Sequence, residues 1–158
     1  MAFLEEELGR VFTAKKLTLA VAESCTGGLL AARITSVPGS SAYLIGGVVS
    51  YSNEAKEILL GVPHDLLVKH GAVSGAVAAE MAHRIRERLM VDVGISITGI
   101  AGPTGGTPKK PVGLVWIGLS DRLGVQAMRF QWNEDREGNR QRSVDQALRL
   151  LLEWAAAR

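Results

Sequence analysis

Three residues with reactive or hydrogen-bonding side chains stand where an apolar segment of the sequence ends. Ser24, Cys25 and Thr26 follow the apolar run 17–22 and precede Gly27 and Gly28, after which the spacing becomes helical. A corner between a buried strand and a helix is where α/β proteins bind ligands. The corner offers a nucleophile, and the backbone N–H groups around the two glycines can donate to an oxyanion. The sequence therefore predicts a reaction centre here.

A lysine further along the chain is the candidate base. A serine hydroxyl is a weak nucleophile without a neighbouring base, and the sequence contains no obvious serine, histidine and aspartate triad. Asn53 is expected to cap a short helix that ends at Gly61, which places Lys56 in the first helical turn. The helix dipole and burial would both lower the lysine pKa there and favour a neutral amine. The hydroxyl of Tyr51 could bridge Lys56 and Ser24 by hydrogen bonds.

A third group of polar residues follows another predicted strand, 92–98. The long loop 99–111 matches neither the P-loop nor the dinucleotide motif, but a loop of this length is usually functional or disordered. If the strands are parallel, their polar ends share one sheet edge and form one cleft, where this loop could cradle a phosphate. Arg136 and Arg140, early in the last predicted helix, are candidate phosphate clamps or simply surface charges.

Two other kinds of chemistry have less support in the sequence. Cys25 is a rival nucleophile, although an isolated cysteine beside a strand is usually a small buried hydrophobic residue. The three histidines, His64, His70 and His83, lack ligand spacing with a cysteine or carboxylate, so no metal site is predicted.

The periodicity predicts alternating helices and strands. Strands are expected over 17–22, 42–50, 92–98, 112–119 and 125–132, and the first two are expected to be buried. Helices are expected over 2–16, from a cap at Ser24 or Thr26 to before Pro38, over 53–61, 63–71 and 74–90, and at the chain end. A bulge or close approach is expected at Gly46–Gly47, and a bulge between Ala127 and Met128. This order predicts a three-layer α/β/α sandwich with a mixed, mostly parallel sheet of about five strands, formed by a single domain over 1–158.

The composition excludes several classes of protein. The 158 residues are 47% hydrophobic and 22% charged, without the apolar run of about 18–20 residues that a membrane span needs. A net charge of +2 and 5% aromatic residues do not indicate nucleic-acid binding. The acidic start lacks the basic region of a signal peptide, and the single cysteine fits a reducing cytoplasm. The cluster Arg84, Arg86 and Arg88 is interpreted as a solvated helix face.

Several motifs together resemble one protein family. The residues that carry the resemblance are Ala-Glu-Ser-Cys-Thr-Gly-Gly at 22–28, Ser-Tyr-Ser-Asn-x-x-Lys at 50–56, Gly-Ala-Val-Ser at 71–74, Thr-Gly-Ile-Ala-Gly-Pro at 98–103 with Gly105 and Gly106, and Lys-Pro-Val-Gly at 110–113. In this order they resemble the CinA C-terminal domain family, whose members are nicotinamide-mononucleotide amidohydrolases. The longer relatives carry an N-terminal domain, so this sequence is similar to the stand-alone form.

The resemblance implies a cytoplasmic hydrolase that converts nicotinamide mononucleotide to nicotinate mononucleotide and ammonia without metal or organic cofactor, and that forms a homodimer or a higher homo-oligomer. It implies that Ser24 attacks the carboxamide, Lys56 transfers the proton, and Tyr51 orients or relays. The residues expected to bind substrate are Cys25, Thr26, Gly27, Gly28, Ser50, Thr98, Gly99, Ala101, Gly102, Arg136 and Arg140. The alternative is a non-catalytic nucleotide-binding or regulatory module that keeps the same cleft.

Overall fold

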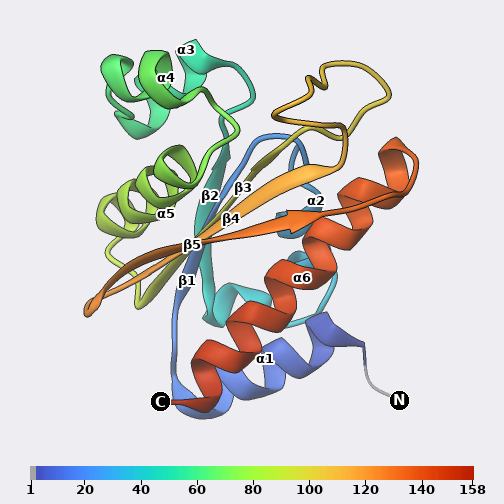
Figure 1. The fold of residues 1–158 in the computed structure, drawn as a ribbon. Coiled ribbons are helices and arrows are strands. Elements are labelled where there is room, and N and C mark those ends of the chain that lie inside the picture. The colour runs from blue at the N-terminus through green and yellow to red at the C-terminus, as the bar shows by residue number, and fades with distance from the viewer. Residues whose placement is uncertain (1–2) are drawn as a thin grey trace.

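The computed structural model describes residues 3–158, which form a five-stranded sheet between two layers of helices (Figure 1). The strand order is β2-β1-β3-β4-β5, in which β1, β2 and β3 are parallel and β4 is antiparallel to both of its neighbours. The strands are β1 Leu19–Glu23, β2 Leu44–Val49, β3 Val93–Gly99, β4 Leu114–Asp121 and β5 Gly124–Gln131. The predicted α/β sandwich with a mixed sheet is confirmed.

Helices α1, α2 and α6 pack on one face of the sheet, and α5 covers the other (Figure 1). The helices are α1 Leu4–Lys15, α2 Leu29–Thr35, α3 Asn53–Ala55, α4 His64–His70, α5 Gly75–Leu89 and α6 Arg136–Ala156, with the short turns η1 Ser40–Ala42 and η2 Lys56–Leu60. Ala2, the expected start of the first helix, lies outside the described residues. Among residues 3–158, no helix is both long enough and apolar enough to cross a bilayer.

Helix α5 lies unusually close to the middle of the sheet, because glycines face it. A Cβ atom at Gly94 would overlap the carbonyl oxygen of Ala82, and one at Gly118 would overlap that of Ala78. Ser96, between these two glycines, donates from its hydroxyl to Ala78 O at 2.6 Å and accepts from Gly118 N at 3.2 Å. This contact fixes α5, and the segment that leads into it, against β3 and β4.

Two predictions about the edge strands are wrong. Strand β2 was expected to be buried, yet every second residue is exposed, with Ile45 49% and Val49 45% accessible, because helices cover one face of this edge strand only in part. The bulge expected in β5 is absent, since the β4–β5 register is continuous over the whole hairpin. The bulge expected near Gly46 is present, where the β1–β2 register shifts.

Candidate active site

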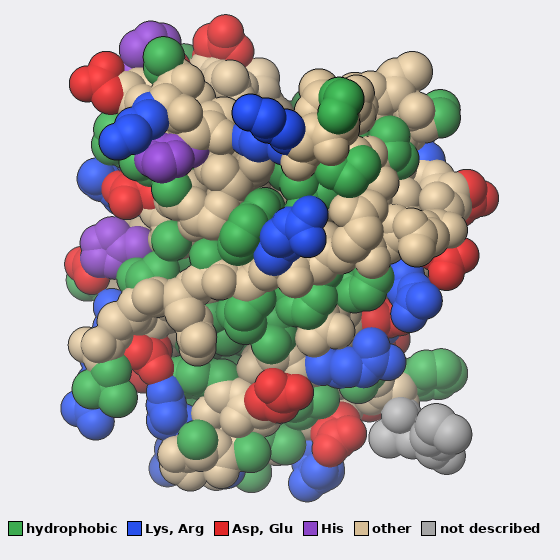
Figure 2. Space-filling view, in the orientation of Figure 1, with side chains coloured by type: hydrophobic (Ala, Val, Ile, Leu, Met, Phe, Trp, Pro, Cys, Tyr) green, Lys and Arg blue, Asp and Glu red, His purple; other side chains and the backbone are tan. Residues whose placement is uncertain are grey.

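The carboxyl ends of the three parallel strands meet above the sheet and enclose a cavity of about 330 Å³. On the face drawn in Figure 2, the surface is hollowed between the α3–α4 region and the loop after β3. Nine predicted site residues line this cavity: Ser24, Cys25, Tyr51, Lys56, Thr98, Gly99, Ala101, Gly102 and Arg136. A larger cavity of about 490 Å³ lies at the opposite end of the sheet, by the β4–β5 turn, and contains neither the serine nor the lysine.

Ser24 and Lys56 are in direct contact inside the cavity. The Nζ atom of Lys56 lies 3.0 Å from Ser24 Oγ, 2.8 Å from Ser50 O and 3.2 Å from Tyr51 O. Ser24 Oγ is also 3.3 Å from Tyr51 O. The side chain of Lys56 is almost fully enclosed, with 1% of its surface accessible. The arrangement brings an alcohol and an amine together away from bulk water.

The helical turn that carries Lys56 begins one residue earlier than expected. Ser52, not Asn53, is the N-cap, and its Oγ accepts from Ala55 N at 3.0 Å. The chain then changes from α3 into the π-helical turn η2 at Lys56. Isolated π turns often occur at functional sites, and this one begins at the lysine whose side chain enters the cavity.

Burial shifts the pKa of two titratable groups beside Ser24, those of Lys56 and Cys25. Removal from water lowers the pKa of Lys56 from its ordinary 10.5 to about 8, which makes the neutral amine accessible near physiological pH. The same effect raises the pKa of the Cys25 thiol to about 12. A thiol that keeps its proton is a poor nucleophile, so the environment favours the serine hydroxyl over the thiol.

The carboxylate of Glu23, which the sequence analysis missed, caps α2 in place of Ser24 or Thr26. Glu23 is 1% exposed and accepts from Thr26 Oγ1 at 2.6 Å, Leu30 N at 2.9 Å, Ala31 N at 3.0 Å and Gly28 N at 3.2 Å. The expectation that this helix start is free for an external anion is therefore wrong, because the chain's own carboxylate occupies it.

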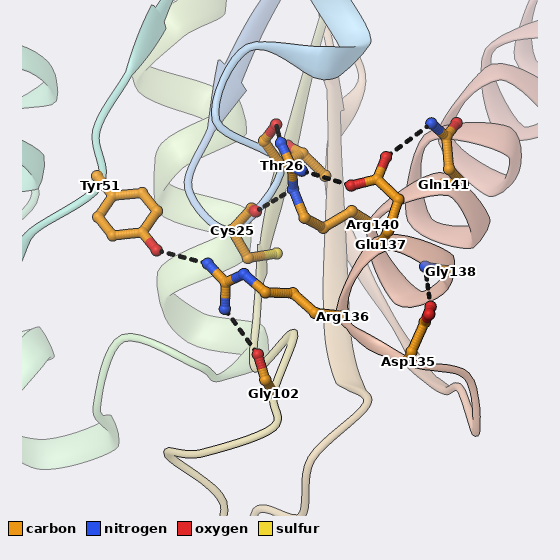
Figure 3. Close-up of polar contacts among 10 residues, drawn as sticks. All are labelled: Cys25, Thr26, Tyr51, Gly102, Asp135, Arg136, Glu137, Gly138, Arg140 and Gln141. Carbon is orange, nitrogen blue, oxygen red and sulfur yellow. Dashed lines mark hydrogen bonds and ion pairs between the residues drawn. The ribbon is translucent and has the colours of Figure 1, made fainter.

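Tyr51 bridges the site by its backbone and not by its hydroxyl. Its carbonyl oxygen contacts both Ser24 and Lys56, whereas its hydroxyl accepts from Arg136 Nη2 at 3.2 Å. Arg136 also donates to Gly102 O at 2.7 Å, so it joins the two sides of the cavity mouth (Figure 3).

Five predicted binding residues do not line the cavity. The carbonyl of Ser50 holds Lys56, and the hydroxyl of Thr26 is bonded to Glu23. Arg140 donates to two main-chain carbonyls in the turn of residues 24–28, called the Ser24 turn below, and does not line the cavity (Figure 3). Gly27 and Gly28 form that turn with positive φ angles of 58° and 103°.

Other cavity residues were not predicted as site residues. They are Ala72, Val73, Ile100, Thr104 and Gly105. Four of the five lie in the sequence motifs, at 71–74, 98–103 and 105–106, and Thr104 lies between two of these, so the motifs could have found them. Thr98 connects the two segments, since its hydroxyl donates to Ala72 O at 2.9 Å.

The chain matches one family over nearly its whole length. The sequence model of the CinA C-terminal domain matches residues 1–155. A putative competence-damage inducible protein of Moorella thermoacetica is 52% identical over 155 residues, which are 98% of this chain and 37% of the relative. A CinA-like protein of Salinibacter ruber is 52% identical over 145 residues, which are 92% of this chain and 35% of the relative. The chain thus spans little more than a third of the length of these curated relatives.

Solved structures give the same result. The crystal structure of a CinA superfamily protein from Klebsiella pneumoniae superposes with a TM-score of 0.94 at 35% identity, covering 98% of this chain and 97% of that one. A competence/damage inducible protein from Agrobacterium tumefaciens superposes with a TM-score of 0.90 at 40% identity, covering 97% of this chain and 96% of that one. By sequence and by fold, this chain belongs to the CinA C-terminal domain family.

Proposed function

We propose that this chain hydrolyses the carboxamide of nicotinamide mononucleotide to nicotinate mononucleotide and ammonia, with Ser24 as nucleophile and Lys56 as base. The observation that carries the proposal is the 3.0 Å contact between the buried Lys56 amine and the Ser24 hydroxyl. Buried amine and hydroxyl groups in this geometry form an activated nucleophile of the serine–lysine kind. The motif resemblance supplies the substrate.

The three contacts of Lys56 suit a neutral amine that accepts a proton. An uncharged amine has two N–H bonds and one lone pair. The carbonyl oxygens of Ser50 and Tyr51 accept hydrogen bonds from the two N–H groups. The lone pair of the amine is then left to accept the proton of the Ser24 hydroxyl. As Ser24 Oγ bonds to the carboxamide carbon, its proton passes to Lys56. The lysine ammonium then protonates the carboxamide nitrogen, which departs as ammonia and leaves an acyl-serine ester and a neutral lysine.

Hydrolysis of this ester repeats the same proton transfers with water. Lys56 takes a proton from water as the oxygen attacks the ester carbon, and returns it to Ser24 Oγ as the ester bond breaks and the carboxylic acid is released, which then loses its proton to solvent. Each half of the reaction returns the lysine to its neutral form, and the whole cycle consumes one water and releases one ammonia.

Backbone N–H groups beside Ser24 are available for the developing oxyanion. Among residues 3–158, the N–H groups of Cys25 and Thr26 donate to no acceptor of another residue, whereas Gly27 N bonds Ser24 O and Gly28 N bonds Glu23. Donors that are held in place and free of other partners are what a tetrahedral intermediate requires. We assign the oxyanion to the N–H of Cys25, because Cys25 lines the cavity whereas Thr26 is fully buried.

The charge of the cavity favours an anionic substrate. Among residues 3–158, its lining contains the guanidinium of Arg136 and the amine of Lys56, which carries a charge only when protonated, and no carboxylate. The contacts of Arg136 are to neutral oxygens of Tyr51 and Gly102, so its charge is available to a phosphate at the mouth. The volume of about 330 Å³ is in the range of small-molecule sites.

The test is ammonia release from nicotinamide mononucleotide by the purified chain. Ser24→Ala and Lys56→Met should abolish release, while Arg142→Ala, on the same helix as Arg136 but paired with Glu134 outside the cavity, should leave it intact. Full activity in either of the first two variants contradicts the mechanism. Tight binding of the mononucleotide without ammonia release by the wild type instead supports a binding module.

A further inference from the structure

The guanidinium of Arg140, a candidate phosphate clamp in the sequence, donates hydrogen bonds to two backbone carbonyls next to Ser24. We propose that Arg140 is a positioning residue that holds the Ser24 turn so that the Cys25 N–H group can receive the oxyanion. This inference rests on the serine chemistry proposed above, and it assigns to Arg140 a role that acts through the backbone.

Arg140 is fixed at three points. Its Nε donates to Cys25 O at 3.3 Å, its Nη2 to Thr26 O at 3.1 Å and its Nη1 to Glu137 Oε2 at 2.8 Å, as Figure 3 shows. A guanidinium is a rigid planar fork, so two successive carbonyls on one fork set the orientation of both peptide groups. The contact ties the start of α6 to a turn 115 residues earlier in the chain.

The carbonyl of Cys25 and the N–H of Thr26 belong to the same planar peptide group. Two bonds from one guanidinium therefore fix the orientation of this peptide and of the one that follows it. A fixed peptide on the carboxyl side of Cys25 limits rotation of that residue, and with it the direction of its own N–H. Cys25 lines the cavity and its N–H has no acceptor in another residue, so this N–H can receive an external oxygen.

The turn is held from a second side by Glu23. The carboxylate takes the Thr26 hydroxyl at 2.6 Å and the first N–H groups of α2, beginning with Gly28 at 3.2 Å. Arg140 therefore bonds the backbone carbonyl of Thr26, and Glu23 bonds its side-chain hydroxyl. With both ends of the turn fixed, little reorganisation is needed when charge develops on the substrate, which is how preorganised donors lower a barrier.

A fluorophosphonate ester tests the inference without the natural substrate. Ser24 Oγ bonds to phosphorus, fluoride leaves, the serine proton passes to Lys56, and the phosphoryl oxygen requires the same N–H donor as the amide oxyanion. The rate of Ser24 modification is read by mass spectrometry. We expect Arg140→Ala to slow it by about ten- to a hundredfold, somewhat less than the loss of an oxyanion donor itself. Arg140→Lys, which keeps the charge without the fork, should lie between the two.

Three further readouts separate positioning from other roles. In Arg140→Ala, added methylguanidinium should restore part of the rate, and with nicotinamide mononucleotide kcat should fall while KM stays within about twofold. Arg142→Ala, whose guanidinium lies over Trp132, should behave as wild type. Urea unfolding of each variant shows whether a lower labelling rate is caused by misfolding. If Arg140→Ala is misfolded, the rate of Arg140→Lys and the rescue by methylguanidinium decide whether Arg140 is a positioning residue.

The possible results divide cleanly. Unchanged labelling in Arg140→Ala, or a raised KM with unchanged kcat, overturns the inference and returns Arg140 to phosphate binding. If the wild type is labelled at Ser24 but releases no ammonia, nicotinamide mononucleotide is not the substrate, and the labelling rates still decide the role of Arg140. A wild type that is not labelled overturns both.

Discussion

The buried Lys56 makes stability depend on pH in a direction that a surface lysine would not. Its side chain is 1% exposed and has no carboxylate among its hydrogen-bond partners, so the folded state disfavours the charged form. Lys56→Met replaces it with an uncharged side chain of similar length. The variant also removes hydrogen bonds to two carbonyls, but that loss does not change with pH. The pH dependence of the difference between the two proteins therefore isolates the ionisation of Lys56.

The size of the effect follows from the pKa. A fall of the Lys56 pKa from 10.5 to about 8 means that burying this lysine lowers the free energy of unfolding by about 3 kcal/mol at pH 7, where the unfolded lysine is charged. Because the folded pKa is lowered, the unfolded state binds more protons between about pH 8 and 10.5, and stability rises with pH across that interval. At pH 10 the remaining cost is about 1 kcal/mol. Wild type should thus gain about 2 kcal/mol relative to Lys56→Met between pH 7 and pH 10.

Urea unfolding of both proteins at several pH values measures this difference, with Lys69→Met as the matched control for an exposed lysine. A difference between wild type and Lys56→Met that stays constant from pH 7 to pH 10 would refute the reasoning. So would a wild type that loses stability relative to the variant as the pH rises, because that slope requires a raised pKa.

The remaining predictions concern activity and packing. The kcat/KM for amide hydrolysis should rise through pH 8 and level off above it, as the base becomes neutral; a profile that falls across this range contradicts a lysine base. Glu23→Gln should cost about 2 kcal/mol in urea unfolding because an amide oxygen is a weaker acceptor for the α2 N–H groups, and equal stability would show that these bonds matter little. Cys25→Ser should keep most of the ammonia release, since the thiol is protonated, and complete inactivation would point to thiol chemistry. Gly118→Ala should lower stability by about 1–3 kcal/mol by pushing α5 off the sheet, whereas an unchanged unfolding midpoint would show that the helix can shift freely.

Local patterns predicted the fold where burial and periodicity agree. Strand β1 is buried at every position, and its continuous apolar run indicated this before the structure was known. The edge strands were harder, because no local signal states which strand lacks a neighbour. In β5 the alternation of apolar and polar residues shifts between Ala127 and Met128 because this edge strand is largely exposed. The pairing register with β4 does not shift there.

The candidate site was predictable in its reacting groups and not in its supports. Ser24 and Lys56 could be paired because parallel strands bring their carboxyl ends to one edge. Glu23 looked like an ordinary charged residue, since its four donors come together only when the following turn folds back. Arg140 had two equal interpretations, and the two carbonyls that it holds lie more than a hundred residues away in sequence.

The position of β2 at the sheet edge has a consequence for how activity would fail. The two carbonyls that hold the lysine belong to Ser50 and Tyr51, which follow directly from a strand paired only with β1. If heat or urea peels this border strand away, water reaches the amine, its pKa returns toward the ordinary value, and it takes up a proton at neutral pH. Catalysis should then stop while the central strands and α5 are still intact, so inactivation should precede the loss of helical signal.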